Sequence, residues 1–317
     1  MSVKSIVIVV GLVVAQVLLA VLLLGIFHAP KPHDLPVAVA GRGPLVDGLV
    51  KQLDATPDLA VRRVGSGKAA RALIDEREIY GAYAPRAKVG RVLVARAASP
   101  VVASVLPKVF APIDAKRHAT TALVDVKPLP PDDSGGASAY FLAFIAIIGA
   151  VLIGWMLELL VPSIKRGLGA TLLRLLVIAV FSALSGLALA LYAKSLGVFE
   201  DNVGDVTLAL GLTIFGVSTV QCGYTSVLGG TFGLAFGLLV FVLLGVLVTS
   251  GGSTAPEFLP DVWNTIGGLL PPRSSMQLIA NDAYFDGAAT STPMTVLWIY
   301  VALGGLSMLA FSFIPRR

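Results

Sequence analysis

Two ionisable side chains, Glu158 and Arg174, lie inside long apolar stretches of this sequence. A charge at the centre of a bilayer costs about 3 kcal/mol, so each such residue is a candidate for function. Both lie near the end of their stretch, so they can form an ion pair across residues 161–167 or extend to the polar interface. A role in transport is the functional alternative. No carboxylate falls near the middle of a stretch, so a proton relay has no evident carrier.

A glycine-rich segment at residues 65–69 resembles the end of the phosphate-binding loop G-x-x-x-x-G-K-[ST]. Arg62 stands where the first glycine belongs, and Ala69 replaces the hydroxyl that would bind a metal ion. The segment therefore predicts a strand-to-helix turn in which glycine supplies backbone freedom.

Residue types for metal binding and catalysis are scarce. The chain has one Cys and three His, and the apolar stretches contain neither a His nor a pair of carboxylates. These counts exclude a disulfide framework and a Cys-rich zinc site. We expect no cofactor, no metal site, no catalytic residue and no enzymatic activity.

The composition is that of an integral membrane protein. Apolar residues make up 56% of the 317 residues and charged residues 14%, with a mean hydropathy of +0.86, whereas a soluble protein carries about 25% charged residues. The net charge of +5 is too small to indicate binding of nucleic acid. Residues 28–138 hold 16 of the 24 basic and 11 of the 19 acidic residues, so a polar insert interrupts a hydrophobic chain.

Six apolar stretches are predicted to span a bilayer, for which a helix needs about 20 residues. They cover residues 5–27, 139–160, 168–192, 206–220, 226–250 and 294–314. The first exceeds the apolar part of a signal peptide, so residues 1–27 are expected to remain as an N-terminal transmembrane anchor. Gly204, Gly211 and Gly216 interrupt the fourth, which predicts a bent or partly re-entrant helix. The expected fold class is an α-helical polytopic membrane protein with six transmembrane helices and one extracytoplasmic α/β domain inserted between helices 1 and 2.

The orientation follows from the basic residues of the short loops, which favour the cytoplasmic side. One side carries six bases and one acid, and the other carries two bases and seven acids. The six bases are Lys4, Lys165, Arg166, Arg174, Arg316 and Arg317. Both termini are therefore predicted to be cytoplasmic, in the plasma membrane. Residues 28–138 then form an extracytoplasmic domain and residues 139–317 a five-helix transmembrane domain.

The polar insert alternates between strand and helix patterns. Strands are expected at residues 35–40, 59–64, 79–84, 89–97 and 122–126, and helices at 44–53, 68–77 and from 99 onward. Ser99 followed by Pro100 is a typical helix start. Pro107 and Pro112 predict that this last helix ends or kinks near Leu106. The basic residues of the insert form either a patch for an envelope lipid or polymer or an ordinary solvated surface.

Small residues recur along the fifth stretch. Gly229, Gly233 and Gly237 follow one another at intervals of four residues, and Gly245 continues the same face. Repeated G-x-x-x-G spacing lets another helix approach closely. The face is predicted to serve either packing inside the bundle or the seam of a homodimer. Cys222 is expected in a short inner turn, as a buried inert thiol.

Residues 251–293 are expected to form an external helical loop. Residues 254–257 and 274–277 have the spacing of capping boxes, which start helices. The apolar residues that follow at helical spacing include Phe258, Leu259, Trp263 and Ile266. The pattern predicts two short amphipathic helices, joined at residues 271–272, that lie in the outer leaflet or dip into it.

Several short segments carry a family resemblance. They are the rhythm of residues 35–40 and 69–77 with Tyr80-Gly81-Ala82, the run from Gly251-Gly252-Ser253 to Pro256-Glu257-Phe258-Leu259-Pro260, and Leu269-Leu270-Pro271-Pro272 followed by Tyr284-Phe285-Asp286-Gly287. With one span, an external α/β domain and five further spans, the chain resembles the ABC-2-type transporter permease superfamily. It is most similar to the YhgE/Pip (phage infection protein)-like branch, over essentially the whole chain.

The resemblance implies a permease subunit that dimerises, moves lipid, polymer or drug-like substrates outward, and is energised by a separate cytoplasmic ABC ATPase. The partners implied are the lipid bilayer, that ATPase, a second copy of the chain and an envelope lipid or polymer. The inner connections at residues 161–167 and 221–225 are short, so either the ends of the third span dock the ATPase or none binds. The alternative function is a receptor or scaffold that transports nothing and whose external domain binds an envelope partner.

Overall fold

Six helices of the computed structural model are long and apolar enough to cross a membrane. The structure describes residues 3–28, 30–160, 167–252 and 255–311. The six spans are formed by α1 (Val3–Phe27), α5 (Ser138–Leu160), α6 (Leu168–Ser195), α7 (Val203–Leu228), α8 (Gly230–Gly237) continued by the π-helix η2 (Leu238–Val248), and α11 (Ser291–Phe311). The prediction of six helices able to span a membrane is confirmed.

The central helix of the bundle is α7, against which α5, α6 and α11 pack. It runs without a break from Val203 to Leu228, so the expectation of a partly re-entrant helix is wrong. Gly216 serves close packing instead, because a Cβ there would lie 3.3 Å from the backbone nitrogen of Val301 in α11. Cys222 lies buried within the helix, and the chain turns at Gly229, where φ is +82°. The short inner turn expected at residues 221–225 is therefore also wrong.

The glycine face of the fifth span is turned into the bundle. A Cβ on Gly233 would lie 2.5 Å from the Cα of Thr225 in α7, and one on Gly237 would overlap the amide of Gln221. Gly245 faces Pro272 in the same way, at 2.6 Å. Gly229 is not on the face, because it forms the turn between α7 and α8. Of the two alternatives, these contacts favour packing inside the bundle.

Residues 35–125 fold into a five-stranded sheet with three helices, which we call the sheet unit. The strands are β1 (Leu35–Ala40), β2 (Leu59–Val64), β3 (Gly81–Ala84), β4 (Val89–Val94) and β5 (Thr120–Asp125). Their spatial order is β2-β1-β3-β4-β5, and every pair is parallel except β3 with β4. α2 (Pro44–Asp54) and α4 (Pro100–Lys116) cover one face, and α3 (Gly67–Asp75) covers the other. All eight elements were expected from the sequence pattern.

α4 continues to Lys116, so an end near Leu106 is wrong. A proline inside a helix removes one hydrogen bond and costs about 3 kcal/mol. Leu106 and Phe110 are fully buried against the sheet, whereas Pro112 lies exposed on the outer side. Burial of the inner face therefore offsets the local cost of the two prolines.

The glycine-rich segment at residues 65–69 forms the turn that the sequence predicts. Ser66 caps α3, because its hydroxyl oxygen accepts a hydrogen bond of 3.2 Å from the backbone N–H of Ala69. Nearby basic residues are paired with acids, Arg62 with Glu78 at 2.5 Å and Arg63 with Asp47. This part of the basic surface is an ordinary mixed-charge surface.

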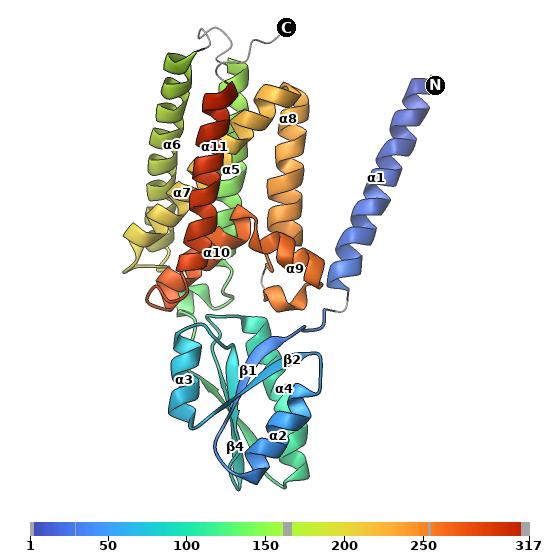
Figure 1. Ribbon diagram of the computed structural model, residues 1–317, viewed down its shortest axis with the longest axis vertical. Helices are drawn as coiled ribbons and strands as arrows, with labels where there is room; N and C mark the ends of the chain where they lie inside the picture. The colour runs from blue at the N-terminus through green and yellow to red at the C-terminus, as the bar shows by residue number, and fades with distance from the viewer. Residues whose placement is uncertain (1–2, 29, 161–166, 253–254, 312–317) are drawn as a thin grey trace.

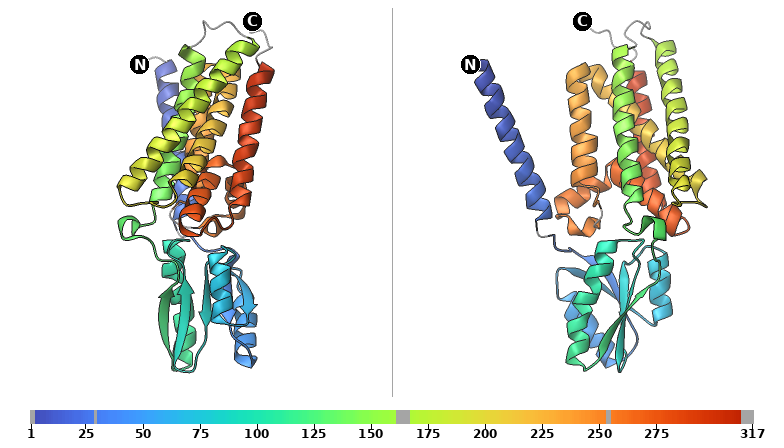
Figure 2. Two further views of the ribbon diagram at one scale, coloured as in Figure 1. Left: turned by 90° about the vertical axis from the view of Figure 1, so that its left-hand side faces the viewer. Right: turned by 180° about the vertical axis from the view of Figure 1, so that it is seen from behind.

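The sheet unit lies at one end of the helical bundle, and the N-terminal end of α1 and the C-terminal end of α11 lie at the other (Figures 1 and 2). α1 leans away from the other spans, and its last turn makes the contact, through Ile26 with Val248 and Leu259. The side chains of five bases that predict the orientation lie outside the described residues, namely Lys4, Lys165, Arg166, Arg316 and Arg317. The side of the membrane therefore stays a prediction.

Candidate functional site at the junction of sheet and membrane helices

The segment between η2 and α11 forms three short elements at the junction. They are η3 (Pro256–Phe258), α9 (Asp261–Gly268) and α10 (Pro271–Tyr284). Two helices were predicted, but their starts differ. α9 begins after Pro260, so Phe258 and Leu259 precede it rather than share its face with Trp263. α10 begins at Pro271, because proline suits the first helical turn, where the N–H has no partner. Ser274 therefore lies inside α10, and Thr254 of the first capping box lies outside the described residues.

One arm of this segment enters the core of the sheet unit on the α2 and α4 side. Phe258 is 4% exposed and packs in the cluster that holds Val39 and Phe110. The backbone N–H of His33, just before β1, donates to the carbonyl of Glu257 at 2.8 Å. The expectation that Phe258 lies in the outer leaflet is therefore wrong.

The other arm packs on the opposite side of the sheet, where α3 lies. Phe285, the residue that follows α10, is 2% exposed and belongs to the cluster of Ile74 and Ala82. The Arg77 guanidinium lies 4.7 Å from the centre of the Phe285 ring, and Lys127 pairs with Asp286 at 3.3 Å. The segment thus grips the sheet unit from both faces, and we call residues 255–288 the clamp.

Arg273 of α10 ties the clamp to the end of the fifth span. Its Nε and Nη2 donate to the carbonyl of Thr249 at 2.9 and 2.5 Å, and its Nη1 donates to the carbonyl and the amide oxygen of Asn264 at 2.8 and 2.7 Å. Burial lowers the pKa of the guanidinium to about 10, although Glu257 opposes the shift. The side chain remains a cation at neutral pH and is fully used by the fold.

The remaining expected loop residues face α1 and the surroundings of the bundle. Leu259 is buried with Ile26 and Val248, and Trp263 packs partly against them. Ile266 is partly buried, while Val262 and Leu269 are each 66% exposed. α9 therefore presents an apolar surface beside the lower end of α1, at the level where η2 ends.

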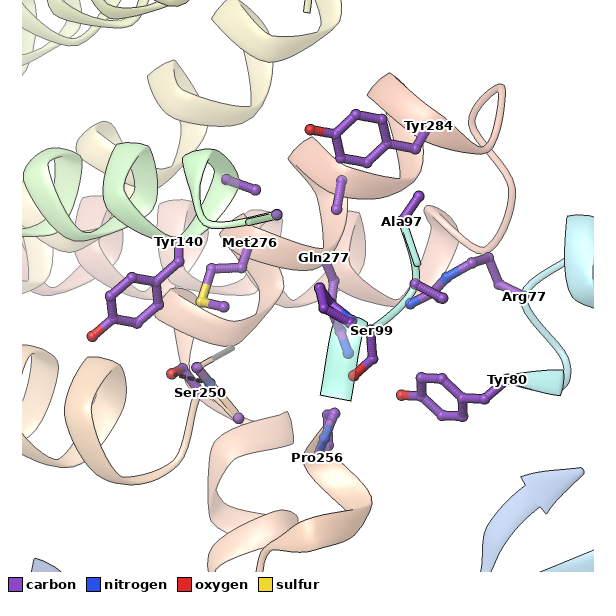
Figure 3. A pocket seen from close by; sticks show the side chains of 17 residues that line it. Arg77, Tyr80, Ala97, Ser99, Tyr140, Ser250, Pro256, Met276, Gln277 and Tyr284 are labelled. Carbon is purple, nitrogen blue, oxygen red and sulfur yellow. Dashed lines mark hydrogen bonds between the residues drawn. The ribbon is translucent and has the colours of Figure 1, made fainter. Parts of the chain in front are cut away.

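A cavity of about 80 Å³ lies between the sheet unit and the ends of α5, η2 and α10 (Figure 3). Its polar lining consists of Arg77, Tyr80, Ser99, Tyr140, Ser250, Gln277 and Tyr284. Arg77 is the one charged residue among the described residues that line it. The cavity is thus built jointly by the sheet unit and the membrane helices.

Two phenols of the cavity are held neutral. Burial, and then the charge of Glu257, raises the pKa of Tyr80 well above its usual value. Burial and a hydrogen bond of 2.7 Å from its hydroxyl to Asp133 raise the pKa of Tyr284 in the same direction. Both hydroxyls keep their protons at physiological pH, so the lining offers hydrogen bonds and adds no negative charge.

Glu158 and Arg174 form the ion pair that was one of the alternatives. Arg174 Nη1 donates to Glu158 Oε1 at 2.9 Å, with side-chain exposures of 15% and 8%. Glu158 lies near the C-terminal end of α5, whereas Tyr140, which lines the cavity, lies in the first turn of that helix. The structure therefore does not bring the pair together with the residues of the cavity.

Sequence reasoning did not identify the cavity residues as a site. Arg77 was placed at the end of a helix, and Tyr80 and Tyr284 entered only as parts of short family segments. No local pattern marks them, because the cavity lining comes from five regions of the chain that meet only through folding. Comparison with protein-family models, with curated proteins and with solved structures finds no match for this chain.

Proposed function

We propose that the chain is the membrane permease subunit of an ABC-2-type exporter, which moves lipid, polymer or drug-like substrates outward with a separate cytoplasmic ATPase. In this proposal the sheet unit is an extracytoplasmic domain inserted between the first and second spans. Two copies of the chain form the transporter in the plasma membrane, with both termini in the cytoplasm.

The observation that carries the proposal is the clamp. The sheet unit already joins the bundle through the links after α1 and before α5. The clamp adds a third attachment from the other end of the chain, with Phe258 and Phe285 on opposite faces of the sheet and Arg273 on the end of η2. An external domain held in this way moves with the fifth and sixth spans. An exporter needs such a connection, because ATP hydrolysis in the cytoplasm must change the conformation on the outer side of the membrane.

Sidedness is tested by labelling single cysteines in a Cys222→Ala background. Lys88→Cys in the exposed turn between β3 and β4 is expected to react with a membrane-impermeant maleimide applied outside intact cells. Lys165→Cys is expected to react only after the membrane is opened. The reverse pattern would refute the proposed topology.

The energy source is tested by purifying the tagged chain from its own membrane in mild detergent. A co-purifying ATPase whose nucleotide hydrolysis changes when Phe258 and Phe285 are both replaced by Ala supports the exporter. Absence of any ATPase across several detergents would argue against it, and the adjacent genes offer an independent check.

The second candidate is a receptor or scaffold that transports nothing. The turn between α7 and α8 favours it, because this turn consists of Gly229 alone and offers an ATPase little surface. A scaffold binds its envelope partner with or without ATP, and its function survives removal of the ATPase gene. The function of an exporter depends on ATP and is lost when the ATPase gene is removed.

A further inference from the structure

The cavity at the junction lies at the depth where the spans end. Tyr140 stands in the first turn of α5, and Ser250 follows the last residues of η2. Lipid headgroups lie at this level, where aromatic side chains with one polar end are enriched. A lipid that enters the cavity from the membrane would therefore place its headgroup there.

The two arginines of the junction differ in how their charge is satisfied. All three guanidinium nitrogens of Arg273 donate hydrogen bonds to oxygens of Thr249 and Asn264. Arg77 donates from Nε to Asn281 at 3.0 Å, and among the described residues no carboxylate lies within 4 Å of it. Arg77 is partly buried and makes no ion pair among the described residues, so an anion supplied from outside would be stabilising.

The guanidinium of Arg77 is also held in place for such an anion. It stacks near the ring of Phe285 at 4.7 Å and that of Tyr80 at 5.7 Å. Its side chain extends into the cavity toward Ser99, opposite Gln277 (Figure 3). Arg77 has a φ of +63°, a region that favours glycine, so the backbone at the end of α3 is strained where this side chain enters the cavity.

We propose that the cavity is a phosphate-binding subsite that takes the headgroup of an anionic phospholipid. The planar fork of Arg77 matches two phosphate oxygens, and the amide of Gln277 supplies a further donor. A cavity of about 80 Å³ has room for about three water molecules, which suits a phosphate group with its acyl chains outside. If the chain is the proposed exporter, this subsite indicates that its substrate class is lipid. The inference depends on the proposed function only in assigning the cavity to the outer side of the membrane.

The test is lipid binding by the purified full-length chain in neutral detergent. Phosphatidylglycerol is expected to bind and to raise the melting temperature, while phosphatidylcholine has little effect. Arg77→Gln is expected to weaken the binding of phosphatidylglycerol about tenfold, since a charge-assisted pair contributes more than 1.4 kcal/mol. Gln277→Leu keeps Arg77 and its contact with Asn281 and is expected to weaken binding by a smaller factor. The matched control is Lys127→Gln, a cation of the same junction that does not line the cavity.

A second arm separates the two sources of phosphate. Inorganic phosphate at millimolar concentration is expected to give no shift. A shift that Arg77→Gln abolishes would show a phosphate site that takes the free ion, and would overturn the lipid assignment. Equal binding of phosphatidylglycerol by wild type, Arg77→Gln and Gln277→Leu would overturn the site itself. None of these measurements needs the ATPase, so their failure is distinct from failure of the exporter proposal.

Discussion

At the residue scale, the pair of Glu158 and Arg174 shows how this chain keeps charge inside its bundle. The two side chains come from neighbouring spans and meet at 2.9 Å with little exposure. An ion pair in such surroundings adds little net stability, but removal of one partner leaves the other charge uncompensated. The pair is therefore explained by its own electrostatics before any transport role is invoked.

Glu158→Gln is expected to lower the free energy of unfolding by about 3 kcal/mol, because Arg174 then remains charged and largely buried. The double variant Glu158→Gln with Arg174→Gln is expected to recover much of the loss. Thermal unfolding in detergent of wild type, Glu158→Gln, Arg174→Gln and the double variant completes the double-mutant cycle. If the single variants unfold like wild type, the pair has no structural role. Export that persists in Glu158→Gln would dismiss proton coupling through this carboxylate.

Asp282 gives a prediction about pH. Burial, and then the charge of Asp205, raises the pKa of Asp282 to about 6. A raised carboxyl pKa means that the folded state binds the proton more tightly, so the contribution of Asp282 to stability is fully present below about pH 4 and is lost as pH rises through about 6. Asp282→Asn is expected to raise the free energy of unfolding by about 1 kcal/mol at pH 8, after allowance for solvent screening, and to have little effect at pH 4. Glu200→Gln, an exposed acid, serves as the control in melting curves at both pH values.

At the element scale, periodicity predicted nearly every helix and strand but failed where packing decides. The sheet unit was predicted element by element, since strand and helix patterns alternate along it and Ser99 followed by Pro100 marks a helix start. The prolines of α4 and the glycines of α7 were interpreted as breaks, because their propensities are local. Burial of Phe110 and close approach at Gly216 override those propensities, and neither is visible in a local pattern.

The same limit explains why the cavity was not predicted. Arg77, Tyr140 and Gln277 come from α3, α5 and α10 or the residues beside them, and nothing in one segment signals the other two. Phe258 and Phe285 likewise match lipid-facing residues in sequence, because an aromatic side chain between prolines and acids suits a membrane surface as well as a protein core. Only the meeting of the clamp with the sheet distinguishes the two.

Gly233→Ala tests whether the glycine face packs inside the bundle. The added Cβ would lie 2.5 Å from the Cα of Thr225, so the helices must move apart, and overpacking of this kind costs about 1 to 3 kcal/mol. Gly149→Ala on α5 meets nothing within 4 Å and is expected to be neutral or slightly stabilising. Melting temperature and oligomeric state are measured together in detergent. A loss of dimer without a loss of monomer stability would show that the face is an intermolecular seam instead.

At the scale of the whole molecule, three attachments join the sheet unit to the spans. Two of them are the covalent links to α1 and α5, and the third is the clamp, which makes only non-covalent contacts with the sheet unit. Links after α1 and before α5 are unavoidable consequences of where the sheet lies in the sequence. The clamp arrives from residues about 130 positions further on and brings its own core residues with it. Such an attachment makes the orientation of the sheet unit depend on the fifth and sixth spans, which is the mechanical basis of the proposed function.

This dependence predicts that the clamp can be loosened without unfolding the bundle. Phe285→Ala removes a ring that is 2% exposed and is expected to cost about 3 kcal/mol of the contact between α10 and the sheet. Hydrogen exchange should then rise in α3, β3 and the residues after α10, while the protection of α5, α6 and α7 stays unchanged. Phe141→Ala, on a ring 55% exposed on α5, is the matched control and should alter neither region. Exchange that rises equally throughout the chain would mean that the sheet unit and the bundle unfold as one unit. In that case the clamp would be part of a single core rather than a joint between two bodies.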